Sequence, residues 1–393
     1  MEKGNENKDR IPVLRFSKFQ QYKSWDKTTI DSIIECENSQ LMLSKVNLSD
    51  KGYPIYGADG IIGYIPHYNK THIYVSIVKD GSGVGRLNLC QAYSSLLGTL
   101  NYLSSKDETA YQTQWIYYLL QTLNFSIYIK GSGIPHIYFN DYKNHIVYVP
   151  NPDEQQKIAD CLSSLDELIE ATVQKVEALK EHKKGLMQQL FPVEGKNVPN
   201  LRFPEFQGTE EWKECSIDEY FDFKQGFQCP IEEQYDKQEN GMVRFIRIID
   251  LTQPSTPYRY INDPGDQYYI NRENLFMVRY GDPGLIGIGY EGIIANNLFQ
   301  LIPKKKSNPY FFYFLFSKEK TRIKGLSSST SLSAINFTSL KALKIVVSQN
   351  IDEQQKIADC LFSLDEFIEA TSRKVEILKD HKKGLMQQLF PKI

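Results

Sequence analysis

Two long stretches of the chain place apolar residues at alternating intervals of four and three, with charged and polar residues between them. This spacing is typical of the narrow seam of a coiled coil. The seam positions are Ile158, Leu162, Leu165, Ile169, Val176, Leu179, Leu186 and Leu190 in the first stretch, and Ile357, Leu361, Leu364, Ile368, Val375, Leu378, Leu385 and Leu389 in the second. Acidic residues begin each stretch, lysines gather near its end and a proline stops it, a polarity that the helix dipole favours. We therefore predict two helices, each about 57 Å long at roughly 1.5 Å per residue.

The two stretches are copies of one another. Residues 153–192 and 352–391 are identical at 34 of 40 positions, with an offset of 199. A shorter motif precedes each copy, since Leu-Arg-Phe leads to Trp25 in the first half and to Trp212 in the second. The segments enclosed by these repeats show little similarity. A repeated frame around two different inserts predicts a globular domain over 1–150, a helix over 151–192, a second globular domain over 193–350 and a helix over 351–393.

Both inserts alternate short β-type and aromatic runs with glycine turns. Such runs are Tyr53–Gly57, Gly60–Tyr64, His72–Val78 and His145–Val149 in the first insert, and Val243–Ile249, Gly292–Ala295 and Leu343–Val347 in the second. Apolar segments near Trp115–Leu123 and Tyr310–Phe316 predict buried helices. The expected fold is mixed α/β, with two globular domains of curved β-sheets. Two long helices pairing as an antiparallel coiled coil join these domains, with an internal pseudo-two-fold repeat.

Packing explains why the seam positions are alike in the two copies, but it does not explain the identity of polar positions off the seam. These positions are Gln155, Gln156, Lys157, Asp166, Glu167, Lys180, Lys184, Gln188 and Gln189, with their counterparts. Either the duplication is recent or both outer faces bind the same partner, and the divergent inserts argue against recency alone. We therefore expect two docking faces for two copies of one partner, related by approximate two-fold symmetry. In the alternative arrangement, each helix packs separately on its own domain.

Charge is spread unevenly along the chain, although the formal net charge is only -2. Residues 296–349 contain nine Lys and Arg residues and a single Glu, which suits phosphate contacts on DNA; the alternative is a solvated charged face. In the first insert, glycine-rich loops over 79–86 and 130–136 place a few donors where they can reach base edges. The candidate DNA-binding residues are Tyr56, Lys79, Arg86, Lys130, Ser132, His136, Arg244, Arg247, Lys304, Lys305, Lys306, Arg322, Lys324, Ser328 and Thr330.

Catalytic motifs are missing from the sequence. Asn308-Pro-Tyr-Phe311 has one proline fewer than the Asn-Pro-Pro-Tyr/Phe motif of amino-methyltransferases, and no phosphate-binding G-x-x-x-x-G-K-[ST] loop occurs. The six histidines and six cysteines show no metal-ligand spacing. We expect no catalysis, metal or cofactor in this chain. The lack of C-x-x-C pairs, of a long apolar window and of an apolar leader favours the cytoplasm and no membrane contact.

The order of these parts resembles the specificity subunits of type I restriction–modification enzymes. The likeness rests on the Leu-Arg-Phe motif with its tryptophan, the variable domain and the long DEQQKIADCL…HKKGLMQQLFP segment, all present twice, and it covers essentially the whole chain. Tyr53–Gly57, Gly60–Tyr64 and Arg244-Phe-Ile-Arg247 are looser matches. The resemblance implies two target-recognition domains that each read one half of an asymmetric bipartite site on double-stranded DNA. It also implies that the helices act as a ruler and hold two modification methyltransferase subunits, which bring S-adenosylmethionine, while restriction/translocase subunits bring ATP and Mg.

Three other functions stay open at the level of sequence. A specificity subunit of a type II methyltransferase–nuclease has the same DNA-reading role, and the neighbouring genes distinguish it. A coiled-coil scaffold for an assembly without DNA predicts no salt-dependent DNA affinity. An orphan methyltransferase binds S-adenosylmethionine without a partner, and the missing motifs argue against it.

Overall fold

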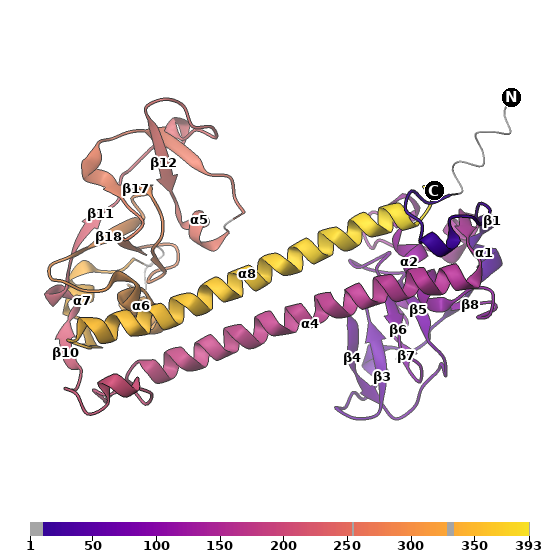
Figure 1. The fold of residues 1–393 in the computed structure, drawn as a ribbon, viewed down its shortest axis with the longest axis horizontal. Helices are drawn as coiled ribbons and strands as arrows, with labels where there is room; N and C mark the ends of the chain where they lie inside the picture. The colour runs from indigo at the N-terminus through magenta and orange to yellow at the C-terminus, as the bar shows by residue number, and fades with distance from the viewer. Residues whose placement is uncertain (1–10, 254, 328–333, 393) are drawn as a thin grey trace. The chain divides into compact units, whose positions relative to one another are not determined.

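A computed structural model describes residues 11–253, 255–327 and 334–392 of the chain (Figure 1). The long helices are α4 (Pro152–Leu190) and α8 (Ile351–Leu389). The chain divides into two compact units, of which unit 1 comprises residues 1–173 and 373–393 and unit 2 comprises residues 174–372. Each unit therefore contains the start of one long helix and the end of the other.

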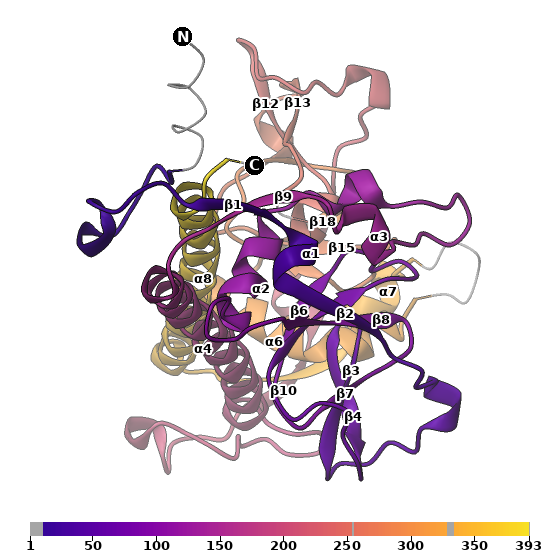
Figure 2. The same ribbon diagram turned by 90° about the vertical axis from the view of Figure 1, so that its right-hand side faces the viewer.

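Unit 1 carries three small sheets. The strands are β1 (Asp26–Thr29), β2 (Ile34–Asn38), β3 (Tyr53–Gly57), β4 (Gly60–Ile65), β5 (Tyr74–Val78), β6 (Leu87–Cys90), β7 (Ser95–Leu96), β8 (Leu100–Ser105) and β9 (Ile146–Val149), and the shorter helices are α1 (Ile30–Ile33), α2 (Thr113–Gln121) and α3 (Phe139–Tyr142). The sheets have the orders β1-β9, β2-β8-β5-β6 and β4-β3-β7 (Figure 2), and β3 and β7 run parallel. Strand β5 is buried along its whole length. Its aromatic, β-branched and small residues suit this place in the middle of a sheet.

Unit 2 repeats this topology with one strand more. Its strands are β10 (Lys213–Ser216), β11 (Phe221–Gln225), β12 (Met242–Ile246), β13 (Arg259–Asn262), β14 (Tyr269–Ile270), β15 (Leu275–Val278), β16 (Ile286–Gly287), β17 (Gly292–Ile294), β18 (Leu298–Pro303) and β19 (Lys344–Val347), and its shorter helices are α5 (Ile248–Thr252), α6 (Pro309–Lys324) and α7 (Phe337–Ala342). The orders are β10-β19, β11-β18-β15-β16 and β13-β12-β17-β14, and β12 and β17 are the parallel pair. Strand β12 thus corresponds to β3, and β17 to β7.

Each unit builds its core where an apolar helix meets the repeated tryptophan. In unit 1, the Trp115 ring on α2 lies 6.3 Å from the Trp25 ring and 6.3 Å from the Phe390 ring. In unit 2, the Phe311 ring on α6 lies 5.6 Å from the Trp212 ring. Phe390 directly follows α8, so the end of this helix completes the core of the first domain.

The two helix segments within each unit run antiparallel. In unit 1, Lys382 donates to Asp166 at 2.6 Å, and in unit 2, Lys183 donates to Asp365 at 2.5 Å. All sixteen seam residues named above are buried or half-buried. The antiparallel side-by-side course is therefore clear within each unit, while the knobs-into-holes geometry of a coiled coil stays a prediction.

The repeated Leu-Arg-Phe motif fastens the helix ends of each unit. In unit 1, Arg15 makes a two-pronged ion pair with Glu154 near the start of α4, with bonds of 2.7 and 2.6 Å. The neighbouring Leu14 N–H donates to the Gln388 carbonyl at the end of α8, at 2.9 Å. Unit 2 repeats both contacts with the corresponding residues. The motif identity thus has a structural cause, because one short segment contacts the start of one helix and the end of the other.

The predicted mixed α/β fold with two domains and two long helices is confirmed. The apolar segments predicted as buried helices are α2 and the first half of α6, and most predicted β runs are strands. One run ends earlier than predicted, because β12 stops at Ile246 and α5 begins at Ile248. The Asp250 side chain accepts the Arg247 backbone N–H at 2.7 Å, and this cap starts a helical turn where apolar composition predicted a longer strand.

Candidate nucleic-acid interface

Two glycine-rich loops of unit 1, residues 79–86 and 130–136, lie side by side. Lys130 and His136 exchange backbone hydrogen bonds of 2.9 and 2.8 Å, and the Gly81 N–H donates to the second loop at 2.9 Å. The structure therefore gathers five residues that were predicted separately from the sequence. They are Lys79, Arg86, Lys130, Ser132 and His136.

Two cations of these loops, Arg86 and Lys130, have acidic partners. Arg86 pairs with Asp59, and Lys130 donates to Asp141 at 2.5 Å. The hydrogen bond from Lys130 lowers the pKa of Asp141. The Arg86 and Lys130 side chains are 50% and 60% exposed, and exposed ion pairs are worth about 0–1 kcal/mol. The Arg86–Asp59 pair, in which both side chains are exposed, therefore adds little to stability.

Tyr56, another candidate from the sequence, lies in the core of unit 1. Its side chain is 7% exposed, and its hydroxyl oxygen accepts the Gln91 backbone N–H at 3.2 Å. Burial raises the pKa of this tyrosine. Strand β3 is buried from Pro54 to Gly57, so the Tyr56 ring packs in the core of unit 1, although the sequence predicted that it binds DNA.

Unit 2 has a corresponding loop over 279–284 that the sequence analysis missed. It follows β15 as the loop over 79–86 follows β5, and it contains two glycines around a proline. Arg279 donates to Gln225 at 2.9 Å, and its guanidinium lies 4.4 Å from the centre of the Phe337 ring. An alignment of the two repeated strand orders would have identified this loop, because it occupies the same place in unit 2 as the loop over 79–86 does in unit 1.

Several cations of the basic stretch of unit 2 pair with acids, most of which come from elsewhere in the sequence. Lys304 lies 3.1 Å from Asp218 and 3.2 Å from Asp222, and Lys341 pairs with both carboxylates. Hydrogen bonds from the lysines lower the pKa of both carboxyl groups and raise the pKa of Lys304. Among the other candidates, Lys305 lies over the Tyr220 ring, Lys306 is exposed, Arg322 pairs with Glu319 and Lys324 with Asp282. Ser328 and Thr330 lie outside the described residues.

The two arginines of the Arg-Phe-Ile-Arg motif have different surroundings. Arg247 forms an ion pair with Asp250 at 3.1 Å and donates to the Pro257 carbonyl at 3.0 Å. Arg244, on β12, stacks on the ring of Tyr258 with 3.7 Å between the guanidinium carbon and the ring centre. Arg247 therefore holds the turn after β12 together, whereas Arg244 is held by ring contacts.

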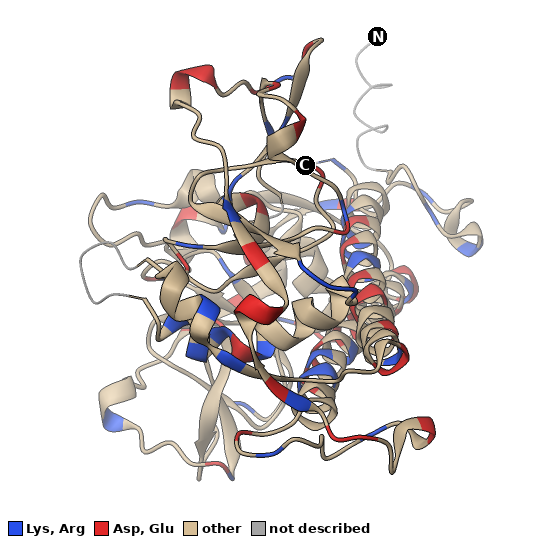
Figure 3. Cartoon of the chain, turned by 90° about the vertical axis from the view of Figure 1, so that its left-hand side faces the viewer, with Lys and Arg blue, Asp and Glu red and all other residues tan. Residues whose placement is uncertain are grey.

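Part of the polar identity between the two long helices has an internal cause. Gln155 is fully buried, accepts the Gln112 N–H at 2.9 Å and donates to the Ala110 and Pro150 carbonyls. Its counterpart Gln354 makes equivalent bonds in unit 2. Two of the nine polar positions, Gln155 and the ion-paired Asp166, therefore need no partner to explain their identity. The exposed identical positions are Gln156, Lys157, Glu167, Lys180, Lys184, Gln188 and Gln189; blue and red segments alternate along the helices in Figure 3.

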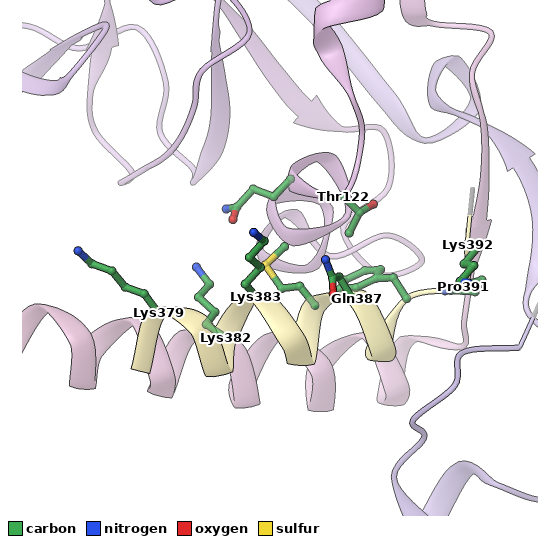
Figure 4. A pocket seen from close by; sticks show the side chains of 10 residues that line it. Thr122, Lys379, Lys382, Lys383, Gln387, Pro391 and Lys392 are labelled. Carbon is green, nitrogen blue, oxygen red and sulfur yellow. The ribbon is translucent and has the colours of Figure 1, made fainter. Parts of the chain in front are cut away.

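A cavity of about 630 Å³ lies in unit 1 beside the end of α8. Figure 4 shows Lys379, Lys382, Lys383 and Gln387 of α8 along it, with Thr122 opposite. Lysines near a helix C-terminus also offset the helix dipole, so their presence alone identifies no ligand. The cavity does border the exposed repeated positions of α8.

The remaining sequence motifs have structural roles. The Asn308 side chain accepts the Phe311 N–H at 2.9 Å and so caps α6, which accounts for the partial methyltransferase motif. Among residues 11–253, 255–327 and 334–392, no three His, Cys, Asp or Glu side chains are grouped to hold a metal ion. Within the same described ranges, no helix is long and apolar enough to cross a bilayer.

The repeated frame has a known counterpart. A family model of the type I restriction modification DNA specificity domain matches residues 22–181 and again residues 209–379. The chain belongs to the type I restriction–modification specificity subunits. This specificity subunit is 25% identical to the putative type I restriction enzyme MjaX specificity subunit of Methanocaldococcus jannaschii, over 97% of this chain and 98% of that protein.

Solved structures share the fold of this specificity subunit. The crystal structure of a type I restriction–modification S subunit from M. genitalium matches with a TM-score of 0.70 at 19% identity, over 97% of this chain and 99% of that one. A chain from a study of complex assembly and conformational transition of the type I R-M system matches with a TM-score of 0.51 at 14% identity, over 93% and 96%. The resemblance to specificity subunits found in the sequence is thus confirmed, and DNA binding follows from the family.

Proposed function

We propose that this specificity subunit reads a bipartite, asymmetric DNA site for a type I complex and performs no catalysis itself. The observation that carries the proposal is a strand order that is common to both units, while the side chains at equivalent loop positions differ. Loop 79–86 brings the exposed Arg86 and a half-buried glycine-rich turn, whereas its counterpart 279–284 brings a stacked Arg279. Two copies of one fold with unlike reading loops suit two unlike half-sites.

The partner complex supplies the chemistry in this proposal. Two modification methyltransferase subunits bring S-adenosylmethionine, and restriction/translocase subunits bring ATP and Mg. The methyltransferases dock on exposed identical positions of α4 and α8, such as Gln188 and Gln189 with their counterparts. Half-site centres about one helical turn apart, roughly 34–36 Å, let two readers contact the same side of a duplex.

The test of DNA reading is genome-wide mapping of adenine methylation in cells that express this chain with its neighbouring methyltransferase gene. We expect a new split motif with a fixed gap, absent from cells without the chain. Exchanging loop 79–86 for an unrelated loop of equal length should alter one half of the motif and leave the other half intact. Unchanged methylation despite complex formation would favour the scaffold alternative.

The test of docking uses substitutions, because truncation of α8 also removes Leu385 and Leu389 from the core of unit 1. Gln188→Arg on α4 should lower the methyltransferase stoichiometry from two to one, and the counterpart Gln387→Arg on α8 should do the same. The double variant should bind none. Glu181→Gln is the matched control, since this exposed position differs between the copies. Two bound methyltransferases in the double variant, measured by native mass spectrometry, would contradict docking on these faces.

A further inference from the structure

One arginine of unit 2 is stacked on aromatic rings. The Arg244 guanidinium carbon lies 3.7 Å from the centre of the Tyr258 ring and 5.4 Å from that of Tyr290. Among the described residues, Arg244 makes no ion pair, and its Nε is buried without a hydrogen-bond acceptor. A buried donor without an acceptor is unfavourable. The ring contacts therefore hold the guanidinium in place, while no described residue accepts a hydrogen bond from it.

The nearby carboxylate is occupied by another arginine. Asp250 is 4% exposed and accepts bonds from the Arg247 backbone N–H at 2.7 Å and from its guanidinium at 3.1 Å. The carbonyl of the same aspartate accepts the Tyr290 hydroxyl at 3.2 Å, which fixes this ring beside Arg244. Asp250 thus holds the Tyr290 ring in place through its carbonyl, while its carboxylate accepts bonds from Arg247.

The equivalent position of unit 1 has no side-chain donor. Phe245 lies opposite Ile293 in the parallel β12–β17 pair, and Ile55 lies opposite Ser95 in the corresponding β3–β7 pair. Counting back one residue aligns Arg244 with Pro54. A proline offers neither a charge nor an N–H. The two units therefore differ in chemistry at one aligned position, as readers of unlike half-sites must.

We propose that Arg244 reads a guanine in the half-site of the second domain, an inference that rests on the proposed DNA-reading function. A guanidinium donates through two parallel N–H groups, and the Hoogsteen edge of guanine offers the matching acceptors O6 and N7. Stacking orders the planar group before DNA arrives, which reduces the entropy lost in each hydrogen bond. The long, exposed lysines of the chain suit phosphate, which needs charge without a fixed plane. Arg244 is half-buried on a strand, and its guanidinium lies against two aromatic rings.

The test combines a protein variant with a modified base. The complex with the methyltransferase is purified, its split motif is mapped, and each guanine of one half-site is replaced in turn by 7-deazaguanine, which lacks N7. For the wild type, one such position should weaken binding roughly ten- to a hundredfold. Arg244→Ala should bind unmodified DNA more weakly by a similar factor, and it should show no further loss at that modified position.

Further variants separate reading from folding and from phosphate contact. Tyr258→Phe keeps the ring and should bind as the wild type does, while Tyr258→Leu should weaken binding at the same guanine and leave the other bases unaffected. Arg259→Ala is the control, because this arginine lies on the adjacent strand in an ion pair with Asp236. Its loss should leave the response to every 7-deazaguanine unchanged.

Several results would overturn the assignment. In one, Arg244→Ala weakens binding equally on all sequences and lowers the salt slope by about one, which is the behaviour of a phosphate contact. In another, neither half-site of the wild-type motif contains a guanine on any strand. Guanine reading by Arg244 then fails, while the proposed function stands. The absence of any motif for the wild-type complex would instead refute the proposed function. Guanine reading would also be refuted if the loss of binding caused by Arg244→Ala added in full to the loss caused by 7-deazaguanine at every position.

Discussion

The two copies of the buried Arg–Glu pair should differ in energy although their sequences match. Within the part of the chain that the structure describes, the Glu154 side chain accepts the two bonds from Arg15 and no others, whereas Glu353 also accepts the Trp212 indole N–H at 3.0 Å and the Ser348 hydroxyl at 2.6 Å. The arginine side chains are 7% and 8% exposed and both glutamates are at most 1% exposed. Removing one partner of a buried pair costs about 3–5 kcal/mol. Glu154→Ala should therefore cost about that much in unit 1.

Glu353→Ala should cost more in unit 2, because two further donors lose their acceptor. A buried donor without a partner costs about 1–3 kcal/mol. The Ser348 hydroxyl keeps the Asn350 carbonyl at 3.4 Å as a second acceptor, so the excess comes mainly from the Trp212 N–H. The expected loss in unit 2 is therefore about 4–8 kcal/mol, which exceeds the loss in unit 1 by the value of one indole donor.

Hydrogen exchange followed by mass spectrometry measures both losses in one sample. We expect the two compact units to open with separate free energies, so peptides from α2 and α6 serve as reporters for unit 1 and unit 2. In each variant, the untouched unit is the internal control. Trp212→Phe removes the indole N–H and keeps a ring, so in that background Glu353→Ala should cost about as much as Glu154→Ala does in the wild type. Equal costs of the two Glu→Ala changes in the wild type would refute the reasoning.

Three further outcomes are expected. Phe390→Ala should cost unit 1 about 3–5 kcal/mol, seen as lost exchange protection in α2 with α6 unchanged; loss in α6 as well would contradict the assignment of the α8 end to unit 1. The pKa of Asp218 is lowered from 3.8 by bonds from Lys341 and Lys304, so this stabilisation is complete above that value and lost as pH falls through the lowered pKa. In Lys341→Ala, the unfolding temperature of unit 2 should therefore fall less between about pH 5 and about pH 3 than it does in the wild type. An equal fall in both proteins would argue against the pairing. In Gly292→Ala, the new Cβ would lie 2.3 Å from the Arg244 carbonyl at a φ of +138°, whereas Gly289→Ala, at +85°, meets nothing within 4 Å. The first change should lower the unfolding temperature of unit 2 well beyond the second, whose strain costs about 1–2 kcal/mol, and similar shifts would contradict the close approach.

The features that could be predicted from the sequence are those that a hydrophobic spacing or an internal repeat reveals directly. Helix α4 begins and ends within two residues of the predicted range 151–192, whereas α8 begins at the predicted residue 351 and ends at Leu389, four residues before the predicted end. The seam spacing persists along both helices, and Pro192 and Pro391 stop it. The repeat identified two domains because identity over forty positions does not depend on knowing any contact. The buried helices followed from unbroken apolar runs. All of these signals are local in sequence or are comparisons of the sequence with itself.

The candidate site was less predictable, because its charges and burial depend on residues far away in sequence. Lys304 lies in a basic stretch, yet its partners Asp218 and Asp222 come from the other side of the domain sequence. Tyr56 is a candidate DNA-binding residue by sequence, but the strands around β3 bury it. Arg279 went unnoticed because only the strand order shows that its loop matches 79–86. Charge counts over a sequence window miss all three effects.

The internal contacts also sharpen what the repeat identity means. Seam residues, Gln155 and its counterpart, and the Asp166–Lys382 pair are conserved between the copies by packing inside one unit, so their likeness carries no information about partners. The Leu-Arg-Phe motif is accounted for in the same way, since it joins two helix ends. What stays unexplained is a smaller set of exposed positions, among them Gln188 and Gln189. A random drift of exposed residues would have altered these first, because surface substitutions cost little stability. Their identity is therefore the strongest reason to seek the methyltransferase contacts on the outer faces of α4 and α8.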